Sequence, residues 1–112
     1  MSLVVEQAQF LMDVCKLVVF ATKQGFVVTG GELFRTPEQQ EIYVKTGRSK
    51  TMNSYHLKRC AIDLNFFKGG ALIYDIKVLA PVGAYWESLN QKNSWGGNWN
   101  SFKDVPHFER RV

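Results

Sequence analysis

The chain has 112 residues, a length that favours a single domain over residues 1–112. Hydrophobic residues make up 46% of it, which is enough for a core and excludes an intrinsically disordered chain. The net charge of +4 suits a polyanionic partner such as nucleic acid or an anionic cell wall, and equally an ordinary basic surface. Nucleic acid is not favoured as a partner, because the basic residues are scattered and form no stripe interleaved with aromatics.

The cysteines and the N-terminal segment bear on the compartment. Cys15 and Cys60 form neither a C-x-x-C motif nor a disulfide framework, so both are expected to be reduced and buried. The first residues lack the basic region and cleavage site of a secretory signal, and the longest apolar run, 17–21, is too short to span a bilayer. We therefore expect a monomer made in the cytoplasm, without a signal peptide and without stable insertion into a membrane.

The first part of the chain predicts two helices and a strand. Apolar residues at i+3 and i+4 spacing over 3–24 predict an amphipathic helix. Residues 26–28 predict a short strand. Thr36 and Pro37 have the identities of an N-cap and a first helical residue, and they predict a second helix that ends at about residue 46.

The second part predicts mainly strands. Residues 60–66 alternate, with Ile62, Leu64 and Phe66 on a core face and Asp63 on the other face beside Ala61. A short strand is expected over 71–74, a helix from Pro81 to about residue 89, a polar loop over 91–100 and a last strand over 105–110. The order predicts an α+β domain with a small antiparallel sheet and flanking helices.

Two segments about 40 residues apart contain the residues with the most chemistry. They hold both histidines of the chain, His56 and His107, together with Asp63 and Asp104. Two imidazoles and one carboxylate are a ligand set typical of catalytic zinc, which keeps one position open for water. Asp104 lies three residues before His107, where a general base could reach that water. The alternative is that both histidines are ordinary, hydrogen-bonded residues and that Asp104 is a turn acid.

The ligand set requires a bend in the chain. His56 precedes the strand that carries Asp63, and seven residues of partly extended chain would separate the two too far. The bend is expected at Lys58 and Arg59. The sheet would then carry the metal site.

Other residues are candidates for contact with a substrate. Arg35 precedes a helix start, where a guanidinium could hold a carboxylate or a polarised carbonyl, and Gln40 lies one turn into that helix. Ser54 is two residues from His56. Trp95 and Trp99 could form a wall of the cleft. Each has an ordinary alternative: a surface salt bridge for Arg35, or coverage of the core for the tryptophans.

The pattern Ser-x-His-x6-Asp followed by Asp-x-x-His resembles the signature of the zinc D-alanyl-D-alanine carboxypeptidase and L-alanyl-D-glutamate endopeptidase family, which includes bacteriophage endolysins. The similarity covers about residues 25–112, and the segments that carry it are 34–40, 54–57, 61–64, 95–99 and 104–109. The resemblance implies the α+β fold of the D-Ala-D-Ala peptidase and hedgehog type.

The resemblance also implies roles. Zinc would be bound by His56, Asp63 and His107. Asp104 would be the catalytic acid and base, Arg35 would stabilise the substrate or the transition state, and Gln40 and Ser54 would contact the substrate. Trp99 is a further candidate for substrate contact, as a wall of the cleft and not through the resemblance.

Two positions depart from the pattern of many members. Arg59 stands where many have glycine, which makes the bend costly if φ is positive there. Asp104 stands where many have Glu, and the shorter side chain favours the endopeptidase branch.

The expected function is hydrolysis of an amide bond in peptidoglycan stem peptides, with the L-alanyl-D-glutamate bond as the best candidate. An endolysin of this kind would leave the cell through a pore protein of the holin type. One alternative is a D-Ala-D-Ala carboxypeptidase or dipeptidase with the same zinc set. Another is a non-catalytic, zinc-stabilised module that binds the wall.

Overall fold

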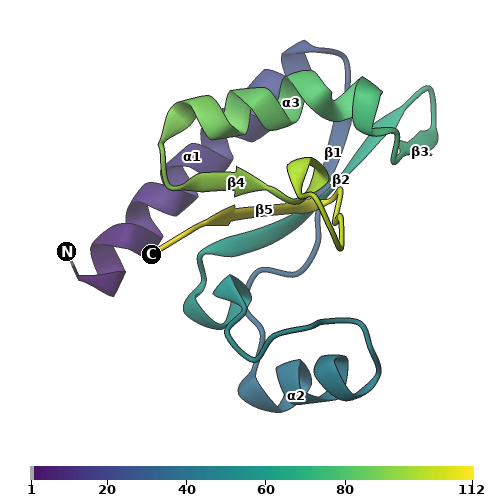
Figure 1. Ribbon diagram of the computed structural model, residues 1–112. Helices are drawn as coiled ribbons and strands as arrows, with labels where there is room; N and C mark the ends of the chain where they lie inside the picture. Colours follow the sequence, from purple (N-terminus) through teal and green to yellow (C-terminus); the bar gives the residue numbers. More distant parts are fainter. Residues whose placement is uncertain (1) are drawn as a thin grey trace.

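The computed structural model describes residues 2–112 and has the expected α+β arrangement, in which two long helices pack against an antiparallel sheet (Figure 1). The helices are α1 (Leu3–Lys23), α2 (Pro37–Lys45) and α3 (Ile76–Leu89), with short 3-10 helices η1 (Tyr55–Lys58) and η2 (Gly96–Asn98). The strands are β1 (Val27–Gly30), β2 (Ala61–Lys68), β3 (Ala71–Ile73), β4 (Asn93–Trp95) and β5 (His107–Arg110).

The sheet is built around β2, its longest strand. The strand order is β1-β2-β5-β4, every pair is antiparallel, and β3 pairs with β2 beyond the end of β5. Because β5 comes from the end of the chain, it brings residues near the C-terminus beside the start of β2. That pairing joins the two segments that contain the histidines.

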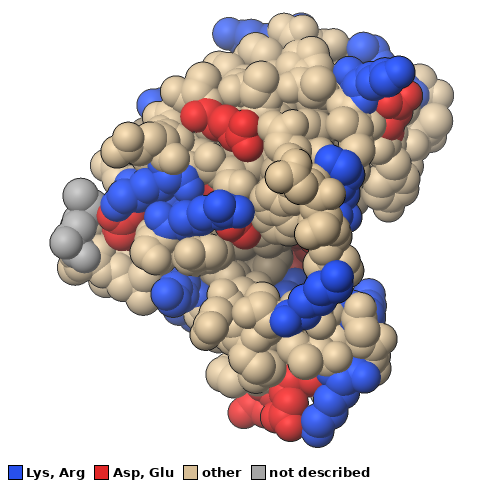
Figure 2. All heavy atoms as spheres, in the orientation of Figure 1, with Lys and Arg blue, Asp and Glu red and all other residues tan. Residues whose placement is uncertain are grey.

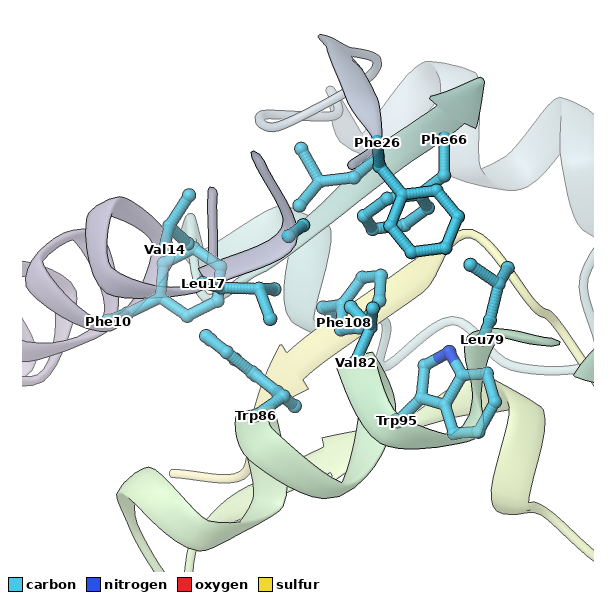
Figure 3. Packing of buried hydrophobic residues seen from close by; sticks show 12 residues of the cluster. Phe10, Val14, Leu17, Phe26, Phe66, Leu79, Val82, Trp86, Trp95 and Phe108 are labelled. Atoms are coloured by element: carbon cyan, nitrogen blue, oxygen red, sulfur yellow. The ribbon is translucent and has the colours of Figure 1, made fainter. Parts of the chain in front are cut away.

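The core lies between the sheet and the helices α1 and α3, which cover the same face (Figures 1 and 3). Phe108 of β5 is fully buried at its centre, with ring centroids 5.9 Å from Trp86 and 5.8 Å from Phe66 in edge-on contacts. Edge-on aromatic pairs contribute about 0.5–1.5 kcal/mol beyond the area that they bury. The predicted core face of β2 is confirmed by Leu64 and Phe66, although Ala61 on the other face is fully buried as well.

Helix α3 begins earlier than expected. The prediction placed Pro81 at the first helical position, but the helix starts at Ile76, and the Asp75 side chain caps it by accepting the N–H of Lys77 at 2.8 Å. Pro81 lies inside the helix, where it removes one backbone hydrogen bond. The buried contacts of α3 with the core offset this loss, since Val82 next to the proline is fully buried.

The predicted loop over 91–100 is also wrong in part. Residues 93–95 form the edge strand β4, because Ser94 lies opposite Glu109 in β5. Trp95 does not form a wall of a cleft but is fully buried in the core. The prediction that both cysteines are buried holds only for Cys60, because Cys15 lies on the exposed side of α1.

The part of the chain that carries α2 lies apart from the core, on the side of the sheet away from α1 and α3 (Figure 1). A hollow separates it from the main body, and Lys and Arg side chains edge this hollow (Figure 2). Within residues 2–112, no helix has both the length and the apolar character required to cross a bilayer.

Candidate active site

Two of the candidate ligands are neighbours in the sheet. Asp63 of β2 lies directly opposite His107 of β5. Leu64 and Phe108, the next residue of each strand, point into the core, so the alternation of strand side chains directs Asp63 and His107 to the other face. The register of a single strand pair therefore positions two of the three candidate ligands.

The third ligand comes from η1. His56 lies in this short helix, which Ser54 begins by accepting the N–H of His56 at 3.3 Å. Arg59 ends it with φ of 54° and ψ of 36°, a left-handed conformation, and its N–H donates to the carbonyl of His56. The bend predicted at Lys58 and Arg59 is confirmed, and a non-glycine residue makes it. The Arg59 guanidinium lies 4.3 Å from the centre of the Phe34 ring.

The three predicted ligands converge. One ligand atom from each of His56, Asp63 and His107 lies within 4.8 Å of the other two. Oδ1 of Asp63 is 3.5 Å from Nε2 of His56 and 3.5 Å from Nδ1 of His107. Two ligands at about 2.0–2.2 Å from a tetrahedral zinc ion are about 3.3–3.6 Å apart, so these separations fit such an ion.

The buried polar atoms support the same conclusion. Nε2 of His56 and Oδ1 of Asp63 are buried, and neither has a hydrogen-bond partner among residues 2–112. Buried polar atoms are normally satisfied, and leaving them unpaired is costly. A bound cation would satisfy both at once.

Each imidazole has a second partner that fixes its ligand nitrogen. Nδ1 of His56 lies 2.9 Å from the carbonyl oxygen of Leu33, so it carries the proton and Nε2 is free to bind a metal. Nε2 of His107 lies 2.7 Å from Oε1 of Glu109, so here Nδ1 is the nitrogen that is free to bind a metal. The two histidines therefore use different nitrogens.

The electrostatics of the cluster favour positive charge at its centre. Burial alone lowers the pKa of His107, but the neighbouring carboxylates of Asp63 and Glu109 raise that pKa to about 9. Burial alone raises the pKa of Asp63, but the imidazoles of His107 and His56 hold it well below its usual range. The pKa of Glu109 is lowered as well, because hydrogen bonds from His107 and Arg111 outweigh the effect of burial.

Asp104 lies beside the ligand cluster without belonging to it. Its Oδ2 is 3.9 Å from Nδ1 of His107, and its side chain is 47% exposed. Partial burial raises the pKa of the Asp104 carboxyl, and the charge of His107 partly opposes this rise. Its N–H donates to the carbonyl of Gly96 at 3.1 Å, and a Cβ on that glycine would collide with the Asp104 backbone. Gly96 thus lets the Asp104 loop approach closely.

The Arg35 side chain lines the cleft with the candidate ligands and is fixed by several partners. Its guanidinium forms a salt bridge with Glu32 and donates to Oε1 of Gln40 at 2.7 Å. The guanidinium also reaches Ser54 Oγ at 3.5 Å. The backbone N–H of Arg35 donates to the carbonyl of His56 at 3.2 Å. Gln40 is fully buried beneath Arg35, so its place is that of a support and not of a surface contact.

These groups face one open cleft of about 670 Å³. Arg35, Ser54, Trp99 and Asp104 line it together with the three candidate ligands. Trp99 is positioned by its Nε1, which donates to Ser94 Oγ at 3.0 Å, and its ring centre is 5.2 Å from that of His107. Of the predicted site residues, Gln40 and Trp95 lie outside the lining.

The sequence reasoning gave no role to Glu109 or to Gly31. The alternation of β5 places Glu109 on the same face as His107 and is the signal that could have found it. No sequence signal marks Gly31, whose N–H donates to the carbonyl of Asp63 at 2.7 Å and where a Cβ would lie 2.9 Å from that oxygen.

A comparison with family models identifies the group of proteins to which these features belong. Residues 47–110, more than half of the chain, match the model described as D-alanyl-D-alanine carboxypeptidase. The chain belongs to this peptidase family. The match includes the three candidate ligands and Asp104.

Two known proteins are similar to this chain in sequence. The L-alanyl-D-glutamate peptidase of Listeria phage A118 is 34% identical over 103 residues, which cover 84% of this chain and 34% of the relative. The peptidoglycan L-alanyl-D-glutamate endopeptidase CwlK of Bacillus subtilis is 31% identical over 106 residues, which cover 80% of this chain and 64% of the relative. The chain thus spans about a third and just under two thirds of the lengths of these relatives.

A solved structure supports the fold. The crystal structure of the Serratia marcescens L-Ala D-Glu endopeptidase ChiX matches with a TM-score of 0.69 and 24% sequence identity, over 88% of this chain and 77% of that one. The match confirms the α+β fold with a small antiparallel sheet and flanking helices.

Proposed function

We propose that this protein is a zinc-dependent peptidoglycan endopeptidase that hydrolyses the amide bond between L-alanine and D-glutamate of the stem peptide. The observation that carries the proposal is the convergence of two imidazoles and a carboxylate, with the separate carboxylate of Asp104 at 3.9 Å from His107, on the wall of an open cleft. The names of the two curated relatives point to this bond.

His56, Asp63 and His107 would hold the ion. When bound, zinc supplies a Lewis acid for the carbonyl of the substrate and lowers the pKa of a water molecule. The donor set is that of a catalytic site, since three protein ligands leave a position open for water or substrate.

Asp104 is proposed to move the proton. It is half exposed in the cleft, so its carboxylate can accept a proton from the attacking water and return it to the leaving nitrogen. Its backbone is fixed through Gly96, which keeps the carboxylate beside the ligand cluster without making it a ligand.

Arg35 is proposed to stabilise the carbonyl oxygen as negative charge develops on it. The salt bridge with Glu32 and the hydrogen bond to Gln40 fix the guanidinium before the substrate arrives, which is the preorganisation that electrostatic catalysis requires. Its contact with Ser54 is long, 3.5 Å, so this N–H and the Ser54 hydroxyl are both available to the substrate. Trp99 offers an apolar wall.

A second candidate activity is removal of a terminal D-alanine by a D-Ala-D-Ala carboxypeptidase, which the description of the family model favours. It uses the same residues and differs only in the peptide bound. A non-catalytic zinc module is a weaker candidate, because a structural site requires neither Asp104 nor Arg35.

The relative from a Listeria phage suggests a place for the activity. We propose that the protein lyses the cell wall from within as an endolysin does, after release through a membrane pore formed by another protein of the holin type.

The test is digestion of purified peptidoglycan by the intact protein, first as prepared, then with a chelator, then with zinc restored. We expect turbidity to fall only when metal is present, and mass spectrometry to find new amino-terminal D-glutamate. Release of free D-alanine instead would establish the carboxypeptidase. Tight zinc binding without any new product would contradict both activities and leave the non-catalytic module.

A further inference from the structure

Two cations in the cleft have no part in the proposed chemistry. Arg48 and Lys50 line the cleft from the segment that follows α2. The other two Lys or Arg residues of the lining, Arg35 and Arg111, each form a salt bridge with a carboxylate. Among the described residues 2–112, neither Arg48 nor Lys50 has a carboxylate within ion-pair distance. The cleft therefore contains two unneutralised positive charges.

Aromatic rings position both charges. The Arg48 guanidinium lies 4.9 Å from the centre of the Tyr43 ring, and Nζ of Lys50 lies 4.9 Å from the centre of the Phe102 ring. Contact with the face of a ring orients a cation and uses none of its N–H donors. Both side chains thus keep their donors for another group.

The backbone of this segment is anchored. The N–H groups of Arg48 and Ser49 donate to the carbonyl of Tyr43, at 2.8 and 3.1 Å. Nε2 of Gln40 donates to Ser49 Oγ at 2.9 Å and to the carbonyl of Thr51. The buried amide of Gln40 therefore fixes Arg35 on one side and the segment with the free cations on the other.

The two sides of the cleft contribute carboxylates and free cations, respectively. Asp63 and Asp104 come from the sheet side, whereas Arg48 and Lys50 come from the part of the chain that carries α2 (Figure 1). Lys and Arg side chains are visible along the edge of the hollow between these parts (Figure 2). A peptide with its scissile carbonyl at the sheet side would present its flanking groups to the cations.

We propose that Arg48 and Lys50 form a carboxylate-binding subsite that selects peptides with a free glutamyl carboxylate next to the bond that is cut. The inference rests on the proposed function. In an Ala–Glu amide, the glutamyl residue has two carboxyl groups, and the peptide continues through only one of them. The other is a free carboxylate close to the leaving nitrogen, and paired cationic donors are its natural partners.

The subsite can be tested without turnover. The probe is the product peptide that begins with D-glutamate, which has no remaining bond to cut. It is prepared with all carboxylates free, with the free glutamyl carboxylate converted to an amide, and with only the C-terminal carboxylate converted. Calorimetry measures binding of each to the zinc-loaded wild type, to the double variant Arg48→Gln and Lys50→Gln, and to a matched double variant, Lys16→Gln and Lys23→Gln, which removes two exposed charges of α1.

We expect the glutamyl amide to bind about tenfold more weakly than the free acid to the wild type and to the α1 variant, since hydrogen bonds to charged groups are this strong. The Arg48 and Lys50 variant should show less than a twofold difference. An equal penalty in all three proteins would overturn the subsite. A tenfold penalty from the C-terminal amide alone would overturn the glutamyl assignment, because the cations would then bind the end of the chain.

The subsite and the proposed function can fail separately. If the zinc-loaded wild type does not cleave an L-alanyl-D-glutamyl peptide, the proposed activity is wrong. The three binding ratios test Arg48 and Lys50 in either event.

Discussion

Replacement of Glu109 by Gln tests how the protein prepares its metal site. Oε1 of Glu109 accepts a hydrogen bond from Nε2 of His107 at 2.7 Å, and both side chains are only 7% exposed. The bond fixes which nitrogen faces the proposed metal site and raises the basicity of the imidazole. Glutamine has the same shape and can still accept the hydrogen bond, but it lacks the charge.

The loss of a partner of this kind lowers metal affinity by about 10- to 100-fold. Because Gln keeps the geometry, we expect the lower end, a rise of about tenfold in the zinc Kd, or about 1.4 kcal/mol. Arg111→Gln should act more weakly, since it removes only the 2.8 Å contact to the other oxygen of Glu109 from a side chain that is 56% exposed.

The assay is competition for zinc against a chromophoric chelator, with circular dichroism as a check of folding. Glu38→Gln is the matched control, because it removes the same charge from an exposed position in the first turn of α2. The reasoning is refuted if folded Glu109→Gln binds zinc within twofold of the wild type, or if Glu38→Gln has an equal effect.

Four further predictions follow from other parts of the structure. Asp104→Asn should keep the zinc Kd within about threefold and lose about 10²- to 10⁴-fold in peptidoglycan hydrolysis, as expected for a general base; a comparable loss of zinc would show that Asp104 is a ligand. Phe108→Ala should lower the free energy of unfolding by about 3–5 kcal/mol in urea denaturation, because the ring is fully buried; a loss below about 1 kcal/mol would contradict its central place in the core. Arg59→Ile should cost about 1–2 kcal/mol and weaken zinc binding, because a β-branched residue does not tolerate φ of 54°; Arg59→Asn should be close to neutral, and equal stability of the two would exclude strain at this bend. Hydrogen bonds from two basic residues lower the pKa of Glu6 from its usual 4.5, so its stabilising contribution should be present above about pH 4.5 and be lost as the pH falls through the lower folded-state pKa. Denaturation between pH 3 and 7 should show a flatter profile for Glu6→Gln, and an unchanged slope would contradict this assignment.

The local patterns predicted much of the site. The alternation of residues 60–66 separated the core face of β2 from the face with Asp63, because strand side chains alternate whatever the partner strand is. The distance between His56 and Asp63 required a bend, and the left-handed Arg59 provides it. The residue chemistry suggested that the two histidines and Asp63 form a group, and the family resemblance assigned them as a ligand set.

Patterns confined to one segment failed where a partner strand or the core decided the outcome. Residues 93–95 read as a polar loop, yet pairing with β5 makes them a strand. Pro81 read as a helix start, yet Asp75 supplies a cap one and a half turns earlier. In both places a contact with residues distant in the chain, or a competing local cap, outweighed the propensity of a single residue.

The sequence by itself determined which residues are candidate ligands, the face of β2 on which Asp63 lies and the position of the bend before it. Only the tertiary structure decided which nitrogen of each histidine faces the candidate metal site, because that choice depends on Leu33 for His56 and on Glu109 for His107. It also decided that Gln40 is a buried support. The contacts of His56 with Leu33 and of Gln40 with Ser49 and Thr51 join separate segments, for which no local pattern carries a signal, whereas the contact of His107 with Glu109 follows from the alternation of β5.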